Sequence, residues 1–113
     1  MLENAPRDSH VCKDEAFAPL VVVSRFSDLE MALHELDDSY YGLQAGIFTA
    51  SLDNALRAAQ ELEFGGVTVN EAPTFRSDQM PYGGVKDSGN TREGPHYAVR
   101  EMTEERLVVV DLP

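Results

Sequence analysis

The chain has few basic residues, a single cysteine, no tryptophan and no long apolar run. Only 9 lysines and arginines stand against 20 acidic residues, and a formal net charge of −11 disfavours binding to nucleic acid and to anionic membranes. The single cysteine, Cys12, excludes a disulfide framework and fits a reducing compartment. No stretch approaches the roughly 18 apolar residues that span a membrane, and Met1–His10 lacks the core of a signal peptide. We therefore expect a cytoplasmic protein without nucleic-acid or membrane partners.

Four short apolar runs predict buried strands in a chain that, at 113 residues, is one domain at most. The first and last runs each contain three consecutive valines, and such unbroken runs are typical of strands that are covered on both faces in parallel sheets. The four predicted strands are Leu20–Phe26, Ala45–Thr49, Gly66–Asn70 and Arg106–Leu112.

Two amphipathic helices are predicted between these strands. Ser27–Glu30 has the form of a capping box, which predicts a helix start, and Ser51 is the expected N-cap of the second helix, which should end by Gly65. Their apolar stripes are Leu29, Ala32, Leu33 and Leu36 in the first helix, and Leu52, Ala55, Leu56 and Ala59 in the second. The order predicts an α/β fold, a right-handed βαβαβ unit with a parallel sheet and three α/β/α layers.

This unit has too few helices to cover both faces of its own sheet. We therefore expect it to be part of a larger sheet, with its final strand, Arg106–Leu112, joining another subunit. The segment Glu71–Thr91 follows the end of the third predicted strand and has no helical or strand periodicity. Open α/β sheets bind their ligands beyond the carboxyl ends of their strands, so this long loop is the expected ligand-binding segment. A short helix with Pro95 in its first turn should follow.

Five local sequences occur in a characteristic order and spacing. They are Asp14–Pro19, Tyr41–Thr49, Gly65–Asn70, Met80–Gly89 and Arg92–Glu93. Together they resemble the carboxy-terminal part of the NAD(P)-dependent aldehyde dehydrogenase superfamily, from about Leu2 to Leu112. The resemblance implies that residues 1–103 belong to the catalytic domain and residues 104–113 form an oligomerisation strand.

The resemblance also implies a chemistry: oxidation of an aldehyde to an acid or acyl thioester, with hydride passing to NAD or NADP. In the family a cysteine attacks the carbonyl, an oxyanion hole stabilises the adduct and a glutamate activates water. The cysteine, that glutamate and the dinucleotide-binding half lie upstream of the matched region. His10 and Val11 precede Cys12 where the nucleophile motif has Gly-Gln, so Cys12 is not the nucleophile. We expect the chain to be inactive alone.

Two residues match the family's contact to the cofactor. By resemblance, the Glu15 carboxylate hydrogen-bonds the hydroxyls of the nicotinamide ribose, and the Phe17 ring packs beside the sugar. A carboxylate suits a diol because it accepts two hydrogen bonds, and an apolar wall fixes the sugar for hydride transfer. The alternative is an exposed acid beside a core phenylalanine. Ala18 departs from the glycine that most relatives have.

Four residues on or before the long loop are candidates for substrate contact. By resemblance, Tyr82 lines the substrate tunnel, Phe75 and Arg76 lie in the stretch that sets aldehyde preference, and Asn70 lies near the reacting centre. A guanidinium suits a carboxylate, phosphate or phosphonate on the substrate. Arg76 is otherwise a solvated surface arginine, and Asn70 is otherwise a structural amide that caps the loop.

Glu93 matches a glutamate that relays protons from the general base in relatives. Because its partners are missing, its role here is at most a remnant, and an ion pair or a helix-start acid is the simpler interpretation. Thr91 replaces a glycine in this motif. The three histidines, His10, His34 and His96, lack the spacing of metal ligands, so no metal site is expected.

Three hypotheses for the whole chain remain. The first is a truncated or excised part of a full dehydrogenase. The second is a free-standing assembly or regulatory module that pairs with a dehydrogenase subunit. The third is a complementing subunit, for which a second polypeptide supplies the nucleophile and the dinucleotide fold.

Overall fold

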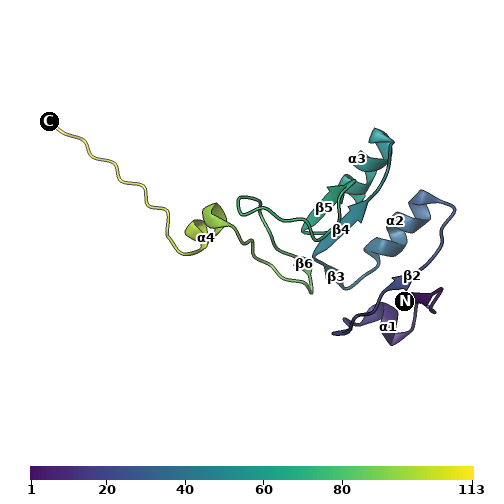
Figure 1. The fold of residues 1–113 in the computed structure, drawn as a ribbon. Coiled ribbons are helices and arrows are strands. Elements are labelled where there is room, and N and C mark those ends of the chain that lie inside the picture. Colours follow the sequence, from purple (N-terminus) through teal and green to yellow (C-terminus); the bar gives the residue numbers. More distant parts are fainter.

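The computed structural model describes all residues of the chain, 1–113. Its helices are α1 (His10–Lys13), α2 (Leu29–Asp37), α3 (Leu52–Glu61) and α4 (Pro95–Glu101). Its strands are β1 (Leu2–Glu3), β2 (Val22–Val23), β3 (Tyr41–Gly42), β4 (Gln44–Ile47), β5 (Gly66–Val69) and β6 (Val85–Lys86). Figure 1 shows α2, α3 and the β4–β5 pair gathered at one end, with α4 and the carboxy-terminal residues extending away from them.

The centre of the structure is the β4–α3–β5 unit, which confirms one of the predicted βαβ units. β4 and β5 pair in parallel, with Ala45 opposite Val67 and Ile47 opposite Val69. A parallel pair needs a crossover connection, and α3 supplies it. Both strands are shorter than predicted: β4 ends before Thr49 and β5 ends before Asn70.

Helices α2 and α3 begin at side-chain caps, although one of the two predicted caps is wrong. The Ser51 hydroxyl accepts a hydrogen bond from the N–H of Asn54 (3.3 Å), which confirms Ser51 as the N-cap of α3. The N-cap of α2 is Asp28 rather than Ser27, because the Asp28 carboxylate accepts from the N–H of Glu30 (3.1 Å). An ionised carboxylate is the stronger acceptor for this position.

Both long helices pack on the same face of the β4–β5 pair, so this unit has two layers and not the predicted three. Leu33 of α2, Ala45 of β4, Ala58 of α3 and Leu62 form the buried core. The stripe predicted for α3 is only partly correct, since Leu52 and Leu56 are 71% and 52% exposed. The helix buries two of its three alanines, Ala55 and Ala58, and small side chains permit close approach.

The predicted three-stranded parallel sheet is not formed. Within the predicted strand Leu20–Phe26 only Val22–Val23 is a strand, and it pairs in parallel with Leu2–Glu3 instead of with β4. The amino-terminal residues supply its hydrogen bonds: the N–H of Leu2 donates to the Val21 carbonyl over 2.8 Å. The edge of β4 that does not pair with β5 therefore lacks the strand that was predicted beside it.

A short antiparallel pair joins the long loop to the sheet region, which the prediction of a loop without strands missed. β3 pairs with β6, Tyr41 opposite Lys86 and Gly42 opposite Val85. The Lys86 ammonium then donates to the Asp37 carboxylate (3.1 Å) at the end of α2, and the N–H of Glu63 donates to the same carboxylate (2.7 Å). Burial raises the pKa of Asp37, but the hydrogen bonds from Glu63 and Lys86 outweigh it and hold the pKa below its ordinary value.

The carboxy-terminal residues extend from the molecule as a single segment (Figure 1). α4 begins with Pro95 in its first turn, as predicted. Residues 104–113 contain no helix or strand, so the strand predicted at Arg106–Leu112 is not formed in the single chain. A strand requires a hydrogen-bonded neighbour, and none lies beside these residues. Val108, Val109 and Val110 are 69%, 81% and 68% exposed.

Most apolar surface of this chain is uncovered. Only 7 of 113 residues are buried. The radius of gyration is 18.9 Å, whereas a compact chain of this length would have one of roughly 13 Å. No helix has the length and apolar character needed to cross a membrane.

The residue that follows β5 is hydrogen-bonded to a residue just beyond β4. Asn70 has a positive φ of 56°, the N–H of Thr49 donates to its Oδ1 (2.8 Å), and its Nδ2 donates to the Thr49 carbonyl (2.9 Å). Asparagine tolerates this left-handed conformation better than most residues do. The amide thereby fixes where the long loop leaves the sheet.

We predict that Asn70→Ala and Asn70→Gly both speed hydrogen exchange of the Thr49 amide, by about fivefold for the loss of about 1 kcal/mol. Glycine adopts a positive φ without cost, so only Asn70→Ala should also accelerate exchange along β5. NMR hydrogen exchange measures both effects, with Asn54→Ala on α3 as the control. Unchanged Thr49 exchange in both variants would show that the amide tie has no energetic role.

Candidate functional site

The candidate site lies on the loop that follows β5, and close backbone packing fixes the path of this loop. A Cβ atom added at Gly65 would lie 1.6 Å from the Gly83 carbonyl oxygen, so Gly65 admits no side chain. The Thr68 hydroxyl donates to the Glu71 carbonyl (2.9 Å) at the start of the loop. The loop therefore leaves β5 and returns beside it along one defined path.

Arg92 holds the far part of the loop, and sequence reasoning gave it no role. Its Nη1 donates to the carbonyl oxygens of Gly84 and Thr91, both at 2.9 Å. The Ser88 hydroxyl accepts from the N–H of Gly42 (3.0 Å), which joins the loop to β3. The adjacent glycines at positions 83 and 84 were the available signal, because paired glycines mark sites where backbone segments approach closely.

Three of the predicted site residues come together on this loop. The Arg76 Nη2 lies 2.8 Å from the Glu93 Oε2, and the Arg76 Cζ lies 4.1 Å from the centre of the Tyr82 ring. Tyr82 and Glu93 form an antiparallel backbone bridge in which each N–H donates to the other's carbonyl, over 3.2 and 2.6 Å. Residues opposed in this way project their side chains to the same face. Both side chains therefore meet the guanidinium.

The Arg76–Tyr82–Glu93 cluster is open to solvent. The side chains of Arg76 and Glu93 are 44% and 64% exposed. An exposed ion pair contributes little to stability, usually below about 1 kcal/mol, so the cluster is not a core element. A guanidinium stacked on an aromatic ring gains a cation–π interaction and keeps free N–H groups for an anion. This arrangement is chemically suited to bind a carboxylate, sulfonate or phosphate.

The other predicted substrate residues are placed differently. Phe75 is 51% exposed beside Arg76 in the sequence, and its N–H donates to the Ala72 carbonyl (3.0 Å). The Asn70 amide is engaged by both backbone groups of Thr49, as described above, which favours its structural role. The Glu93 carboxylate forms the ion pair that the simpler interpretation anticipated.

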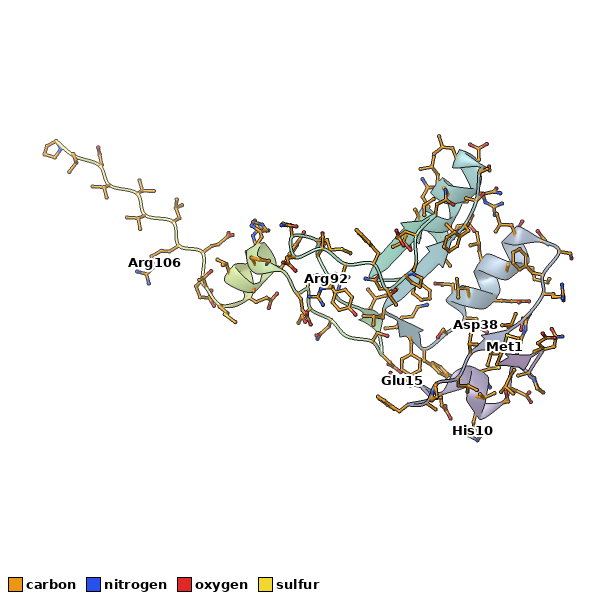
Figure 2. The ribbon with its side chains drawn as sticks, in the orientation of Figure 1. Met1, His10, Glu15, Asp38, Arg92 and Arg106 are labelled. Atoms are coloured by element: carbon orange, nitrogen blue, oxygen red, sulfur yellow. The ribbon has the colours of Figure 1, made fainter.

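The two predicted cofactor residues lie elsewhere, on the segment between α1 and β2. Figure 2 shows Glu15 below β3 and near α1, well separated from Arg92 on the loop. Phe17 is 95% exposed, so it is not the core phenylalanine of the alternative interpretation. An exposed carboxylate and an exposed phenyl ring two residues apart are chemically matched to a ribose diol and its apolar wall. The residues present thus fit a nicotinamide ribose.

Cys12 and the histidines do not form a second site. Cys12 is exposed on α1, and its Sγ lies 4.0 Å from the Ala5 carbonyl oxygen. The His10 Nδ1 is paired with the Asp14 carboxylate at 2.6 Å on the same exposed surface. The structure contains no group of three or more His, Cys, Asp or Glu side chains arranged to hold a metal ion.

Comparison with known proteins identifies the family. The sequence profile of the Aldehyde dehydrogenase family matches residues 1–108. The chain is 49% identical to 3-sulfolactaldehyde dehydrogenase of Priestia aryabhattai over 112 residues, which is 99% of this chain and 24% of that protein. It is also 46% identical to lactaldehyde dehydrogenase of Methanococcus maripaludis over 107 residues, 95% of this chain and 23% of that protein.

Solved structures agree in fold. Aldehyde dehydrogenase 21 of Physcomitrella patens, in complex with the reaction product succinate, superposes with a TM-score of 0.87 at 44% identity, over 90% of this chain and 21% of that chain. The glyceraldehyde-3-phosphate dehydrogenase GapN of Methanocaldococcus jannaschii, complexed with NADP, superposes with a TM-score of 0.81 at 45% identity, over 88% and 22%. The chain spans about a quarter of the length of its curated relatives and belongs to the aldehyde dehydrogenase family.

Proposed function

We propose that this chain is the carboxy-terminal part of the catalytic domain of an NAD(P)-dependent aldehyde dehydrogenase whose substrate carries an anionic group. The observation that carries this proposal is the placement of Arg76, with its guanidinium held at 4.1 Å over the Tyr82 ring on the loop that follows β5. A cation beyond the carboxyl end of a parallel strand lies where α/β enzymes bind their ligands. The chain would therefore contribute substrate selection and leave the covalent chemistry to residues elsewhere.

The names of similar proteins support an anionic substrate. One relative is a 3-sulfolactaldehyde dehydrogenase, and two similar structures are a succinate complex and a glyceraldehyde-3-phosphate dehydrogenase. Sulfonate, carboxylate and phosphate are all anions that a guanidinium binds through paired N–H groups. The lactaldehyde dehydrogenases are named for a neutral aldehyde, so a neutral substrate is the alternative that an experiment must separate.

The cofactor contact is proposed for Glu15 and Phe17. NAD or NADP would supply the hydride acceptor for the aldehyde carbon. The Glu15 carboxylate would accept hydrogen bonds from the hydroxyls of the nicotinamide ribose, and Phe17 would cover one side of the sugar. The exposure of both side chains in the single chain is compatible with this role.

A second candidate function is a complementing or assembly subunit, and an uncovered apolar groove between α2 and β4 is as compatible with it as with the first. The groove has a volume of about 320 Å³, and its lining includes Phe26, Leu29, Leu36 and Ile47. An apolar groove in a chain with so small a core marks a contact surface. The same surface would be covered by preceding residues of one polypeptide or by a separate one, so the first and third hypotheses share this feature.

The proposed partner for residues 104–113 is a second copy of the enzyme subunit. Three adjacent valines lie in an extended, exposed segment whose backbone N–H and carbonyl groups have no strand partner. Such an edge pairs readily with the sheet of a neighbour.

The isolated chain is predicted to show no aldehyde oxidation above the buffer background, with NAD or NADP. The covalent route needs an activated thiolate, and Cys12 lies on exposed α1 outside the loop site. The absorbance of reduced nicotinamide measures this activity, with Cys12→Ser as the control. Turnover that persists through purification and disappears in the Cys12→Ser variant would refute the assignment of Cys12 as a bystander.

The anionic preference is testable in a chimera. This chain would replace the matching quarter of the Priestia aryabhattai 3-sulfolactaldehyde dehydrogenase. The test aldehydes are 4-oxobutanoate, whose oxidation gives succinate, and the neutral butanal. We predict that Arg76→Ala lowers kcat/KM for 4-oxobutanoate by about ten- to a hundredfold, the value of one charge-assisted contact, and leaves butanal unchanged.

Tyr82→Ala is the comparison variant in the same chimera and should impair both aldehydes, because it removes apolar surface as well as the cation–π contact. Arg76→Lys should retain part of the preference, since lysine keeps the charge without the planar fork. Equal losses for the two aldehydes in Arg76→Ala would assign Arg76 to the scaffold and rule out the anionic substrate class.

Self-association through the carboxy-terminal segment gives a further prediction. The intact chain should form dimers or larger species in light scattering, and removal of residues 104–113 should shift it toward monomer or insoluble material. Replacing Val109 with proline, which removes one backbone donor from the strand, should weaken association without shortening the chain. A monomer at high concentration from the intact chain would exclude this role.

A further inference from the structure

The chain turns between Arg76 and Tyr82, and two hydrogen bonds between Ser77 and Met80 close this turn. The N–H of Met80 donates to the Ser77 carbonyl (3.2 Å), and the N–H of Ser77 donates to the Met80 Sδ (3.2 Å). The second bond is uncommon, because a thioether is a weak acceptor and a turn N–H is more often bound by an oxygen. Substrate selection by Arg76 alone gives this sulfur no role.

The hydrogen bond to the sulfur acts on the backbone of Arg76. The Ser77 N–H belongs to the peptide group that joins Arg76 to Ser77, so holding it fixes the orientation of the backbone from which the arginine side chain starts. Met80 is itself held in place. It is half-buried, and its carbonyl oxygen lies against Gly94, where an added Cβ would be 3.1 Å from that oxygen. The sulfur is therefore presented from a fixed residue.

The segment that continues from the turn to the aromatic ring is stiff. Pro81 has a fixed φ and restricts Met80 before it to extended conformations. Tyr82 is then held by its antiparallel bridge to Glu93. With this side of the turn rigid, the turn itself decides where the arginine lies relative to the ring, and the Arg76 Cζ lies 4.1 Å from the ring centre.

We propose that Met80 is a positioning residue for substrate selection: its sulfur holds the turn that places the Arg76 guanidinium over the Tyr82 ring, ready for the anionic group of the substrate. This inference rests on the proposed function. Met80 acts through Arg76 and needs no contact with substrate or cofactor. A guanidinium whose backbone is already ordered loses less conformational entropy when it binds an anion, so the sulfur should lower KM for anionic aldehydes.

The first test uses the Priestia aryabhattai chimera with 4-oxobutanoate and butanal. Met80→Leu keeps the volume of the side chain and removes the acceptor. It should raise KM for 4-oxobutanoate by about two- to fivefold, the loss of one hydrogen bond to a weak acceptor, and leave kcat/KM for butanal unchanged. Met80→Gln should keep KM near that of the unmodified chimera, because its amide oxygen can accept from the Ser77 N–H. Met102→Leu on an 84% exposed methionine is the matched control and should have no effect.

The second test needs no activity and uses this chain alone. Hydrogen exchange of the Ser77 amide, followed by NMR, should be about two- to fivefold faster in Met80→Leu and unchanged in Met102→Leu. Met80→Gln should again restore the slower exchange. Equal Ser77 exchange in the unmodified chain and in Met80→Leu would show that the sulfur does not hold the turn, and the inference would fail whatever the substrate is.

A double variant separates action through Arg76 from a direct effect on the substrate. If Met80 acts only through the guanidinium, Met80→Leu combined with Arg76→Ala should be no worse for 4-oxobutanoate than Arg76→Ala alone. Equal losses for both aldehydes in Met80→Leu, or a loss that Met80→Gln does not relieve, would assign Met80 to packing and overturn the inference. A selective loss in Arg76→Ala without one in Met80→Leu would overturn this inference alone. No selective loss in Arg76→Ala would overturn the proposed substrate class as well.

Discussion

Parallel pairing of β4 with β5 is the interaction on which the rest of this structure depends. The four paired positions from Gln44–Gly66 to Ile47–Val69 place α3 across one face of the pair. α2 packs beside α3, and its Leu33 joins Ala45 and Ala58 in the buried core. The pairing also sets where β5 ends, and the amide of Asn70 fixes that end to Thr49. The long loop therefore begins from a defined point, and this starting point helps to position the Arg76–Tyr82–Glu93 cluster.

The same pairing leaves much of the chain uncovered. The two helices occupy one face of a two-stranded unit, β2 pairs with β1 away from it, and the carboxy-terminal segment extends without a partner. A chain of this length that buries so few residues gains little from the hydrophobic effect, which is the main favourable term in folding. The proposed function assigns these exposed surfaces to contacts with the rest of an aldehyde dehydrogenase and with a neighbouring subunit.

Sequence reasoning succeeded where local signals and packing agree. The β4–α3–β5 order, the Ser51 cap and Pro95 in the first turn of α4 each follow from short-range chemistry that the fold retains. It failed where the outcome depends on long-range partners. The apolar run Leu20–Phe26 indicates a buried strand, but the strand that forms is set by the residues of β1 that happen to lie beside it. The β3–β6 pair has too few residues to leave a periodic signal.

The candidate site shows the same division. Family resemblance pointed to Arg76, Tyr82 and Glu93 separately, and only the structure shows that an antiparallel bridge brings them into one cluster. The sequence did not indicate a role for Arg92, because its side chain donates to backbone carbonyl oxygens, which every residue type has. Glu15 and Phe17 stay apart from the cluster in this chain, so their proposed role requires the rest of the enzyme.

The central claim is that the uncovered apolar surfaces bind the upstream part of an aldehyde dehydrogenase. Hydrogen exchange of this chain, alone and mixed with the upstream three quarters of the Priestia aryabhattai enzyme, tests it most directly. We predict strong new protection in α2 and in Ser24–Phe26, which border the apolar groove, and little change in the already paired β4 and β5. Identical exchange in the presence and absence of the upstream part would contradict it.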